Sequence, residues 1–282
     1  MTVTESELAG FAASHDIISL GVAADEVRRR LHGARTTFVR VADVGAAPGA
    51  PVEIPPAAGE IRIVGAPISE AAALERVREV VSAAGTTPVS AFSLADLEAL
   101  VAGDEKRLRG LLDGLKRAGL DLVSEAPFDQ LREARVTIGH LGAAGLSLAR
   151  LTIQALPSAN APDLYRRIAA LQHDVGGLRA FAPLPRSINP SVPTTGYDDV
   201  RRVALARLFV SNIPSMQVDW SLYGPKLAQV ALTVGADDLD AVSPLDEAGE
   251  GWRRAPLEEV RRNIRAASLD PVERDGRFHV RV

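Results

Sequence analysis

The sequence contains no cysteine among its 282 residues. Disulfides, thiolate zinc sites, cysteine nucleophiles and iron–sulfur clusters held by cysteine are therefore excluded for this chain. Aromatic residues make up only 4% of the chain, so stacking platforms for single-stranded nucleic acid are not expected. The 32 basic and 36 acidic residues nearly balance, with a net charge of −4. This balance gives no electrostatic reason to expect nucleic acid as a partner.

Long apolar runs are also missing. None approaches the roughly 18 residues of a membrane span, and the first residues lack the basic start and apolar core of a signal peptide. The five histidines show no metal-ligand spacing, so we expect no metal site. Together these absences predict a cytoplasmic protein without a membrane span.

Short β-branched runs alternate with amphipathic helical patterns along the chain, which is typical of an α/β fold with a parallel sheet. Eight such runs predict a (βα)8 TIM-like barrel, a fold that typically needs about 250 residues. We expect an N-terminal helical segment over residues 1–33 and a single barrel domain over 34–282. The expected strands are 36–43, 60–65, 89–92, 120–124, 148–155, 178–182, 216–220 and 238–242, with a peripheral strand at 278–282.

One connection breaks the alternation. Residues 44–59 contain four prolines and no helical period, and prolines throughout a segment prevent a helix. Parallel neighbours are usually joined by a helical crossover. The first helix of the barrel is therefore expected to be missing, and the barrel to be modified or open around its first βα unit.

Several stretches resemble the aminofutalosine synthase, dehypoxanthine futalosine cyclase and deazaflavin-precursor (FO) synthase group of radical-SAM enzymes. The similarity runs in colinear order over residues 17–275 and includes Leu171-Gln172-His173-Asp174, Thr195-Gly196-Tyr197-Asp198-Asp199 and Gly224-Pro225-Lys226-Leu227-Ala228. It implies a radical-SAM-type barrel.

The departures from this group fall on its chemistry. The resemblance implies a CxxxCxxC loop after the first strand, which binds a [4Fe–4S] cluster; this chain has the proline-rich segment 44–59 instead. The group's Gly-Gly after the second strand, which contacts adenosylmethionine, is reduced to Val64-Gly65-Ala66. We therefore expect neither a cysteine-held cluster nor bound adenosylmethionine, and the group's radical reaction is not inherited.

In such a barrel, ligands bind at the C-terminal ends of the strands. Asp219 and Glu125 are the candidate catalytic residues, because a carboxylate there can act as a base. An exposed loop glutamate and a rim ion pair of Asp219 with Lys226 or Arg186 are the structural alternatives. The candidate ligand-binding residues are Arg40, Asp43, Ser93, Gln154, Arg186, Asn189, Trp220 and Tyr223.

Three functions remain open. The first is a cluster-free protein of futalosine-type menaquinone biosynthesis, a pseudoenzyme that binds a small molecule or serves as a partner subunit. It would form a homo-oligomer or a heteromer with an active radical-SAM paralogue. The second is an enzyme using cluster-independent acid/base chemistry on a futalosine-like or chorismate-derived carboxylate. The third is a diverged barrel with a ligand outside this pathway.

Overall fold

The strands form a closed barrel. This computed structural model describes residues 4–155, 161–187, 194–247 and 254–281. Its parallel strands follow one another around the ring, and the last pairs with the first. Because β5 and β6 form one interrupted strand, the ring has eight positions, and the predicted (βα)8 TIM-like fold is confirmed. The strands are β1 (Arg35–Gly45), β2 (Glu60–Val64), β3 (Val89–Ser93), β4 (Leu122–Pro127), β5 (Ser147–Leu148), β6 (Leu151–Ile153), β7 (Ala180–Pro185), β8 (Ser215–Asp219) and β9 (Asp238–Val242).

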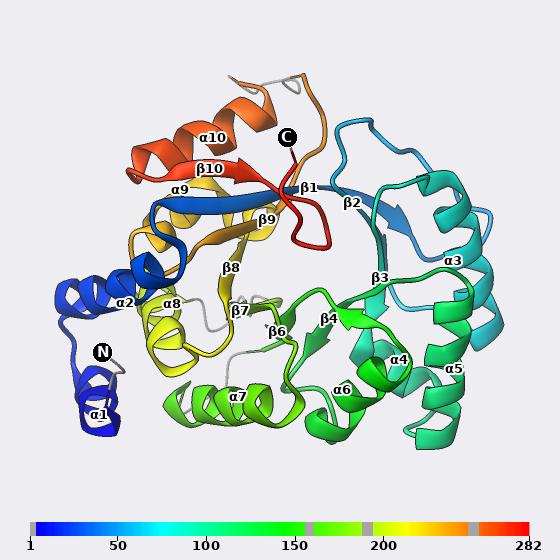
Figure 1. Ribbon diagram of the computed structural model, residues 1–282, viewed down its shortest axis with the longest axis horizontal. Coiled ribbons are helices and arrows are strands. Elements are labelled where there is room, and N and C mark those ends of the chain that lie inside the picture. The colour runs from blue at the N-terminus through cyan, green and yellow to red at the C-terminus, as the bar shows by residue number, and fades with distance from the viewer. Residues whose placement is uncertain (1–3, 156–160, 188–193, 248–253, 282) are drawn as a thin grey trace.

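Helices surround the ring (Figure 1). One of them, α4, was not predicted from the sequence, and α9 is kinked at Gly224, where φ is 73°. None of the helices in the described part of the chain is long and apolar enough to cross a membrane. The helices are α1 (Glu5–Ala13), α2 (Ile17–His32), α3 (Glu70–Ala84), α4 (Leu94–Leu100), α5 (Glu105–Arg117), α6 (Ala134–Ala143), α7 (Ala161–Val175), α8 (Gly196–Phe209), α9 (Trp220–Leu232) and α10 (Pro256–Ala266).

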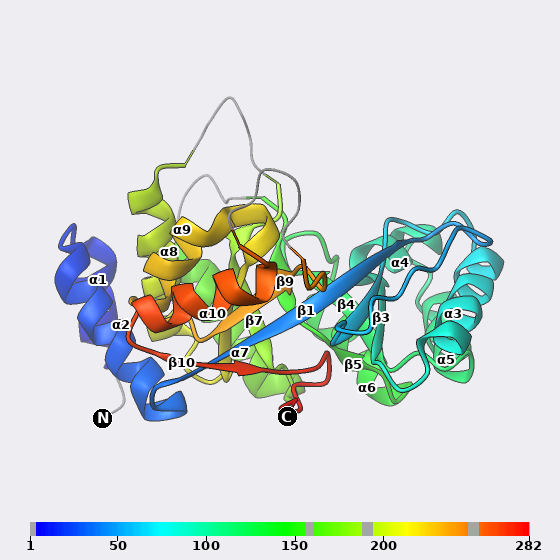
Figure 2. The same ribbon diagram turned by 90° about the horizontal axis from the view of Figure 1, so that it is seen from above.

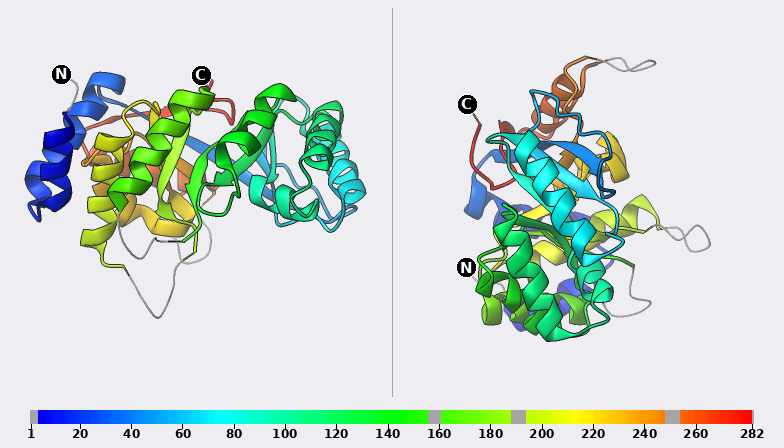
Figure 3. Two further views of the ribbon diagram at one scale, coloured as in Figure 1. Left: turned by 90° about the horizontal axis from the view of Figure 1, so that it is seen from below. Right: turned by 90° about the vertical axis from the view of Figure 1, so that its right-hand side faces the viewer.

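The N-terminal helices pack on the outside of the barrel beside α8. Arg201 of α8 donates to the carbonyl oxygen of Ala12 at 2.5 Å, and Tyr197 donates to that of His15 at 2.7 Å. Figure 3 shows α1 at the end of the molecule opposite to α3 and α5. Helix α1 therefore lies far from α3 and α5, whereas α2 leads directly into β1.

The connection between β1 and β2 contains no helix, as the prolines predicted. Of the two expected alternatives, the barrel is modified at this unit rather than open, because β1 and β2 pair directly, with Val41 opposite Glu60. Residues 46–59 run beside α3 and are fixed to it by the buried Arg76. Its guanidinium donates to the carbonyl oxygens of Gly45 and Ala50 at 2.7 and 2.9 Å. In the described part of the chain, β1 and β2 are therefore paired although no helix joins them.

The long strand β1 crosses most of the molecule (Figure 2). Its last residues pair with β2, whereas its first residues pair with β9 and with a tenth strand, β10 (Asp270–Glu273). The peripheral strand expected at 278–282 is replaced by β10 and an isolated bridge between Arg274 and Val280. The described C-terminal residues thus return beneath the N-terminal ends of the barrel strands.

Candidate functional site

Buried ion pairs fill much of the barrel interior. Arg62 of β2 forms two hydrogen bonds with Asp240 of β9, at 2.9 and 3.1 Å, and a third with Glu60 at 2.9 Å. Arg150, between β5 and β6, contacts the same Asp240 at 2.9 Å. Because β2 and β9 are both neighbours of β1, the Arg62–Asp240 pair reaches past β1 through the lumen. Burial alone would raise the pKa of Asp240, but Arg150 and Arg62 outweigh it and hold this pKa far below its ordinary value.

A second group of ion pairs lies at the C-terminal ends of β4, β7 and β8. Arg186 contacts Glu125 at 3.2 Å and donates to Asp219. Asp219 also caps α9, because its Oδ1 accepts from the Leu222 amide at 2.9 Å and from the Ser221 hydroxyl at 3.0 Å. Both candidate catalytic carboxylates are therefore bound to one guanidinium. The rim ion pair considered for Asp219 forms with Arg186, and Glu125 lies on β4 rather than in an exposed loop.

A cavity of about 220 Å³, here called the lumen cavity, lies between these two groups of ion pairs. It is lined by arginines 62, 150 and 186 together with Ser93, Asp96 and Glu125. The Ser93 hydroxyl and the Arg150 Nε are buried and have no hydrogen-bond partner within the described residues. Burial raises the pKa of Asp96, and the charge of Glu125 raises it further. Buried polar atoms without partners are rare in proteins, so this cavity is suited to a small polar ligand group.

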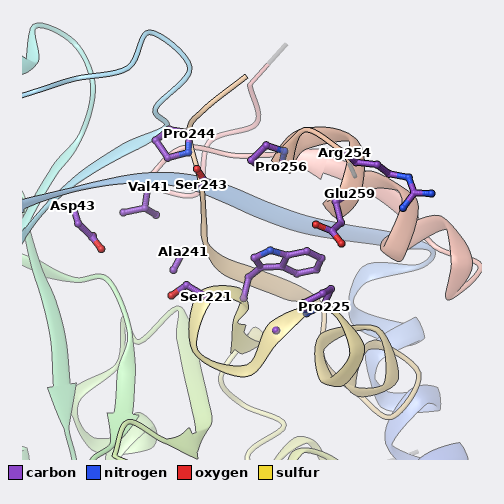
Figure 4. Close-up of a pocket in the computed structure, with 12 residues that line it drawn as sticks. Val41, Asp43, Ser221, Pro225, Ala241, Ser243, Pro244, Arg254, Pro256 and Glu259 are labelled. Atoms are coloured by element: carbon purple, nitrogen blue, oxygen red, sulfur yellow. The ribbon is translucent and has the colours of Figure 1, made fainter. Parts of the chain in front are cut away.

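A larger cavity of about 770 Å³, here called the mouth cavity, opens beside the end of β9 (Figure 4). Trp220 and three prolines give it an apolar wall, and Asp43 and Glu259 supply carboxylates. In Figure 4, Glu259 of α10 points into the cavity, Arg254 points away from it, and Asp43 lies at its far end. Burial raises the pKa of Asp43 more than the nearby Arg62 lowers it. The cavity has the size and mixed lining of a small-molecule site.

Three further predicted site residues line neither of the two cavities. Arg40 is placed in an ion-pair cluster with Glu273 at 3.0 Å and Asp246 at 2.8 Å, and it lines neither cavity. Tyr223 donates to the carbonyl oxygen of Pro185 at 2.6 Å. Gln154 is tied through its backbone amide to Asp129, 2.7 Å away. Asn189 lies outside the described residues.

Four residues of the site were not found from the sequence: Arg62, Asp96, Arg150 and Asp240. A signal existed for two of them. In a strand, residues two apart face the same side, so Glu60 with Arg62, and Asp238 with Asp240, each place two charges on one face. A charged pair on the inner face of a barrel strand requires partners across the lumen.

The family match and the similar proteins point to the same enzyme group. Residues 184–282 match the family described as the CofH/MqnC C-terminal region. Aminodeoxyfutalosine synthase of Thermus thermophilus is 33% identical over 41% of this chain and 35% of its own length. Cyclic dehypoxanthine futalosine synthase of Streptomyces coelicolor is 30% identical over 39% of this chain and 29% of its own length. The resemblance to this enzyme group is confirmed.

The matched segments span about a third of the length of these curated relatives. A 5-amino-6-(D-ribitylamino)uracil–L-tyrosine 4-hydroxyphenyl transferase of Archaeoglobus fulgidus is also similar, with 33% identity over 40% of this chain and 36% of its own length. Among solved structures, methylornithine synthase has a TM-score of 0.66 and 13% identity, covering 96% of this chain and 94% of that one. This likeness concerns the fold alone.

The radical-SAM relationship implies a thiolate-bound iron–sulfur cluster, and the residues present do not fit one. The chain has no cysteine, and the loop after β1 is held against α3 by Arg76 and Glu79. Within the described ranges, no three histidine or carboxylate side chains are grouped to hold a metal ion.

Proposed function

We propose that this protein is a cluster-free, radical-SAM-like barrel of futalosine-type menaquinone biosynthesis. It binds a small molecule at the mouth of the barrel in the cytoplasm and performs no radical chemistry. The observation that carries the proposal is the loop after β1. It lacks the cluster ligands, and Arg76 and Glu79 of α3 bind its backbone at Gly45, Gly49 and Ala50. A related barrel with this loop keeps a binding site but has no means of holding the cofactor.

The two cavities support a ligand with a polar end and a flat or apolar body. The unpartnered Ser93 hydroxyl and Arg150 Nε can hydrogen-bond a polar group in the lumen cavity. The indole of Trp220 in the mouth cavity offers a surface on which a ring can pack. Glu259 can accept hydrogen bonds from donors on that ring. Futalosine-like and chorismate-derived compounds combine such parts.

Glu259 provides a direct test, because it points into the mouth cavity while its neighbour Glu258 lies in the outward-facing groove of α10. Thermal unfolding is measured with a panel of futalosine-pathway intermediates. A ligand at 100 times its dissociation constant adds about 2.7 kcal/mol to the free energy of unfolding. We expect Glu259→Gln to need at least ten times more ligand for the same stabilisation. Glu258→Gln should need the same ligand concentration as the unaltered protein. If no intermediate raises the melting temperature of the unaltered protein, the proposal fails.

A partner subunit role rests on the sequence relationship rather than on a free strand edge, since β1 and β2 are paired. A homo-oligomer, or a heteromer with an active radical-SAM paralogue, is the proposed assembly. Co-elution of the purified protein with that paralogue in size-exclusion chromatography tests it. Separate elution at micromolar concentrations would leave only the small-molecule role.

A second candidate function is acid/base catalysis without a cluster. The favouring observation is that burial raises the pKa values of Asp43 and Asp96, each of which lines one of the two cavities. Such a carboxyl group is closer to the ideal pKa of a general acid or base than an ordinary one. Incubating the protein with the same pathway intermediates distinguishes catalysis from binding alone. A new product formed without reductant or adenosylmethionine, and lost in Asp43→Asn, supports catalysis.

A further inference from the structure

A third cavity of about 320 Å³ lies at the opposite end of the barrel, at the N-terminal ends of the strands. This base cavity is formed where α5 ends, where β4 and β5 begin and just before β7. Residues 276–279 of the C-terminal segment close it from below. In TIM barrels, this face ordinarily serves stability rather than catalysis, so a built pocket here calls for its own explanation.

The lining of the base cavity is cationic. Lys116, Arg179 and Arg277 carry positive charges, and Asp121 is the one carboxylate among the lining residues. Three cations against one carboxylate leave two positive charges on the lining, in a chain whose net charge is −4. Burial would raise the pKa of Asp121, but its hydrogen bonds from Arg277 and Lys116 hold this pKa below its ordinary value. Asp121 is therefore ionised, and an excess of positive charge remains.

Within the described residues, Arg179 carries a positive charge that no carboxylate pairs with. Its side chain has no ion pair or hydrogen bond in this part of the chain, and its guanidinium carbon lies 5.2 Å from the centre of the Phe278 ring. A guanidinium over an aromatic ring is held by cation–π attraction. Arg179 is therefore oriented beside the cavity without being neutralised.

The ring that orients Arg179 is itself fixed. The guanidinium carbon of Arg274 lies 3.8 Å from the centre of the Phe278 ring. Arg274 in turn donates two hydrogen bonds to the fully buried Asp238, at 2.7 and 2.6 Å. Phe278 also has a positive φ of 66°. A non-glycine residue keeps this conformation only where its surroundings determine it. The cavity wall is thus pre-organised by the barrel interior.

We propose that the base cavity is a binding site for a small phosphate-bearing anion. Guanidinium and ammonium groups are the usual protein donors to phosphate oxygens, and arginine can donate two parallel hydrogen bonds. The anion joins Arg179, before β7, to Lys116 of α5 and to Arg277 of the C-terminal segment. Its binding strengthens the attachment of that segment to the barrel. The site lies on the face opposite to the mouth and does not depend on the function proposed above.

Inorganic phosphate is the first probe, titrated into the full chain at constant ionic strength set with chloride. We expect phosphate to raise the melting temperature and to slow amide exchange in residues 274–281. Arg179→Gln, which breaks no ion pair within the described residues, is expected to weaken phosphate binding at least tenfold. The control is Arg135→Gln on the exposed face of α6, where the contact with Asp174 is 3.8 Å; it should bind phosphate as the unaltered protein does.

A phosphate monoester such as glycerol 3-phosphate identifies the source of the anion. Tighter binding of the ester than of phosphate points to a phosphorylated metabolite, whereas equal binding points to free phosphate. The proposal is overturned if phosphate has no greater effect than chloride at equal ionic strength. It is also overturned if Arg179→Gln binds phosphate as tightly as Arg135→Gln does.

Discussion

Replacing Asp240 with asparagine is expected to lower the free energy of unfolding by about 3–5 kcal/mol, the usual cost of removing one partner from a buried ion pair. Asp240 is almost fully buried and contacts two buried guanidiniums, those of Arg62 and Arg150. Without its carboxylate, the ion pairs left to these arginines among the described residues are those of Arg150 with Glu125 at 3.5 Å and of Arg62 with Glu60. Both cations would remain in the lumen with too little negative charge beside them.

The matched control is Asp246→Asn. Asp246 is a largely exposed carboxylate, and its partner Arg40 keeps a second contact with Glu273. Its loss is expected to cost less than about 1 kcal/mol. Urea unfolding at neutral pH measures both variants. Equal destabilisation of the two would show that the lumenal network contributes no more than a surface pair.

Acid unfolding adds a second measure of the same network. The folded pKa of Asp240 is depressed, so the stability it contributes is fully present above the unfolded pKa of about 4. That contribution is lost as the pH falls below this value toward the folded pKa. The dependence of unfolding free energy on pH between about 5 and 2 is therefore expected to be shallower in Asp240→Asn. An unchanged slope would contradict the assignment of the depressed pKa to this residue.

The barrel could be predicted because its repeating unit is local. Each strand is a short apolar, β-branched run, and each crossover carries helical periodicity, so the alternation is visible in the sequence. The structure confirms strands at all eight expected places, with shifted ends. The interruption at Ala149 and Arg150, which divides the fifth strand, was missed. It depends on Arg150 reaching Asp240 across the lumen, which no local pattern reveals.

Helix α4 was missed for a different reason. It has seven residues, and its N-cap Ser93 makes no capping hydrogen bond, so both the length and the start signal of a helix were weak. The same Ser93 was nevertheless predicted as a ligand-binding residue, because it ends β3. Position at a strand end was the useful guide to the site, and it brought Ser93, Glu125 and Arg186 together around one cavity.

Pairing within the site could be read from the sequence only in part. Arg186 was predicted as a ligand-binding cation, with an ion pair to Asp219 as the alternative; it forms that pair and also contacts Glu125. Arg40 was grouped with it, yet it contacts Glu273 and Asp246 instead. These contacts join residues far apart in the chain, and only the closed ring determines which charges meet. The sequence therefore indicated where polar groups gather but not which of them remain free for a ligand.

Arg76→Met is expected to release the loop after β1 and to lower the free energy of unfolding by about 3 kcal/mol, because buried carbonyl groups lose charged donors. Arg76 is fully buried and donates to Gly45 at the end of β1, to Ala50 on the loop and to Glu79 on its own helix at 2.9 Å. Methionine keeps the apolar stem of the side chain but none of its donors. The loop, which has no helix of its own, loses its main attachment to α3.

The measurement is amide exchange and limited proteolysis of residues 46–59 in the variant and in Arg78→Met, an exposed arginine of the same helix. Exchange in this loop should become much faster in Arg76→Met and stay unchanged in Arg78→Met, while β7 and β8 remain protected in both. Protection of the loop in Arg76→Met would mean that its prolines and its packing alone hold it in place. Faster exchange would instead make one buried guanidinium the main group that fixes this proline-rich segment.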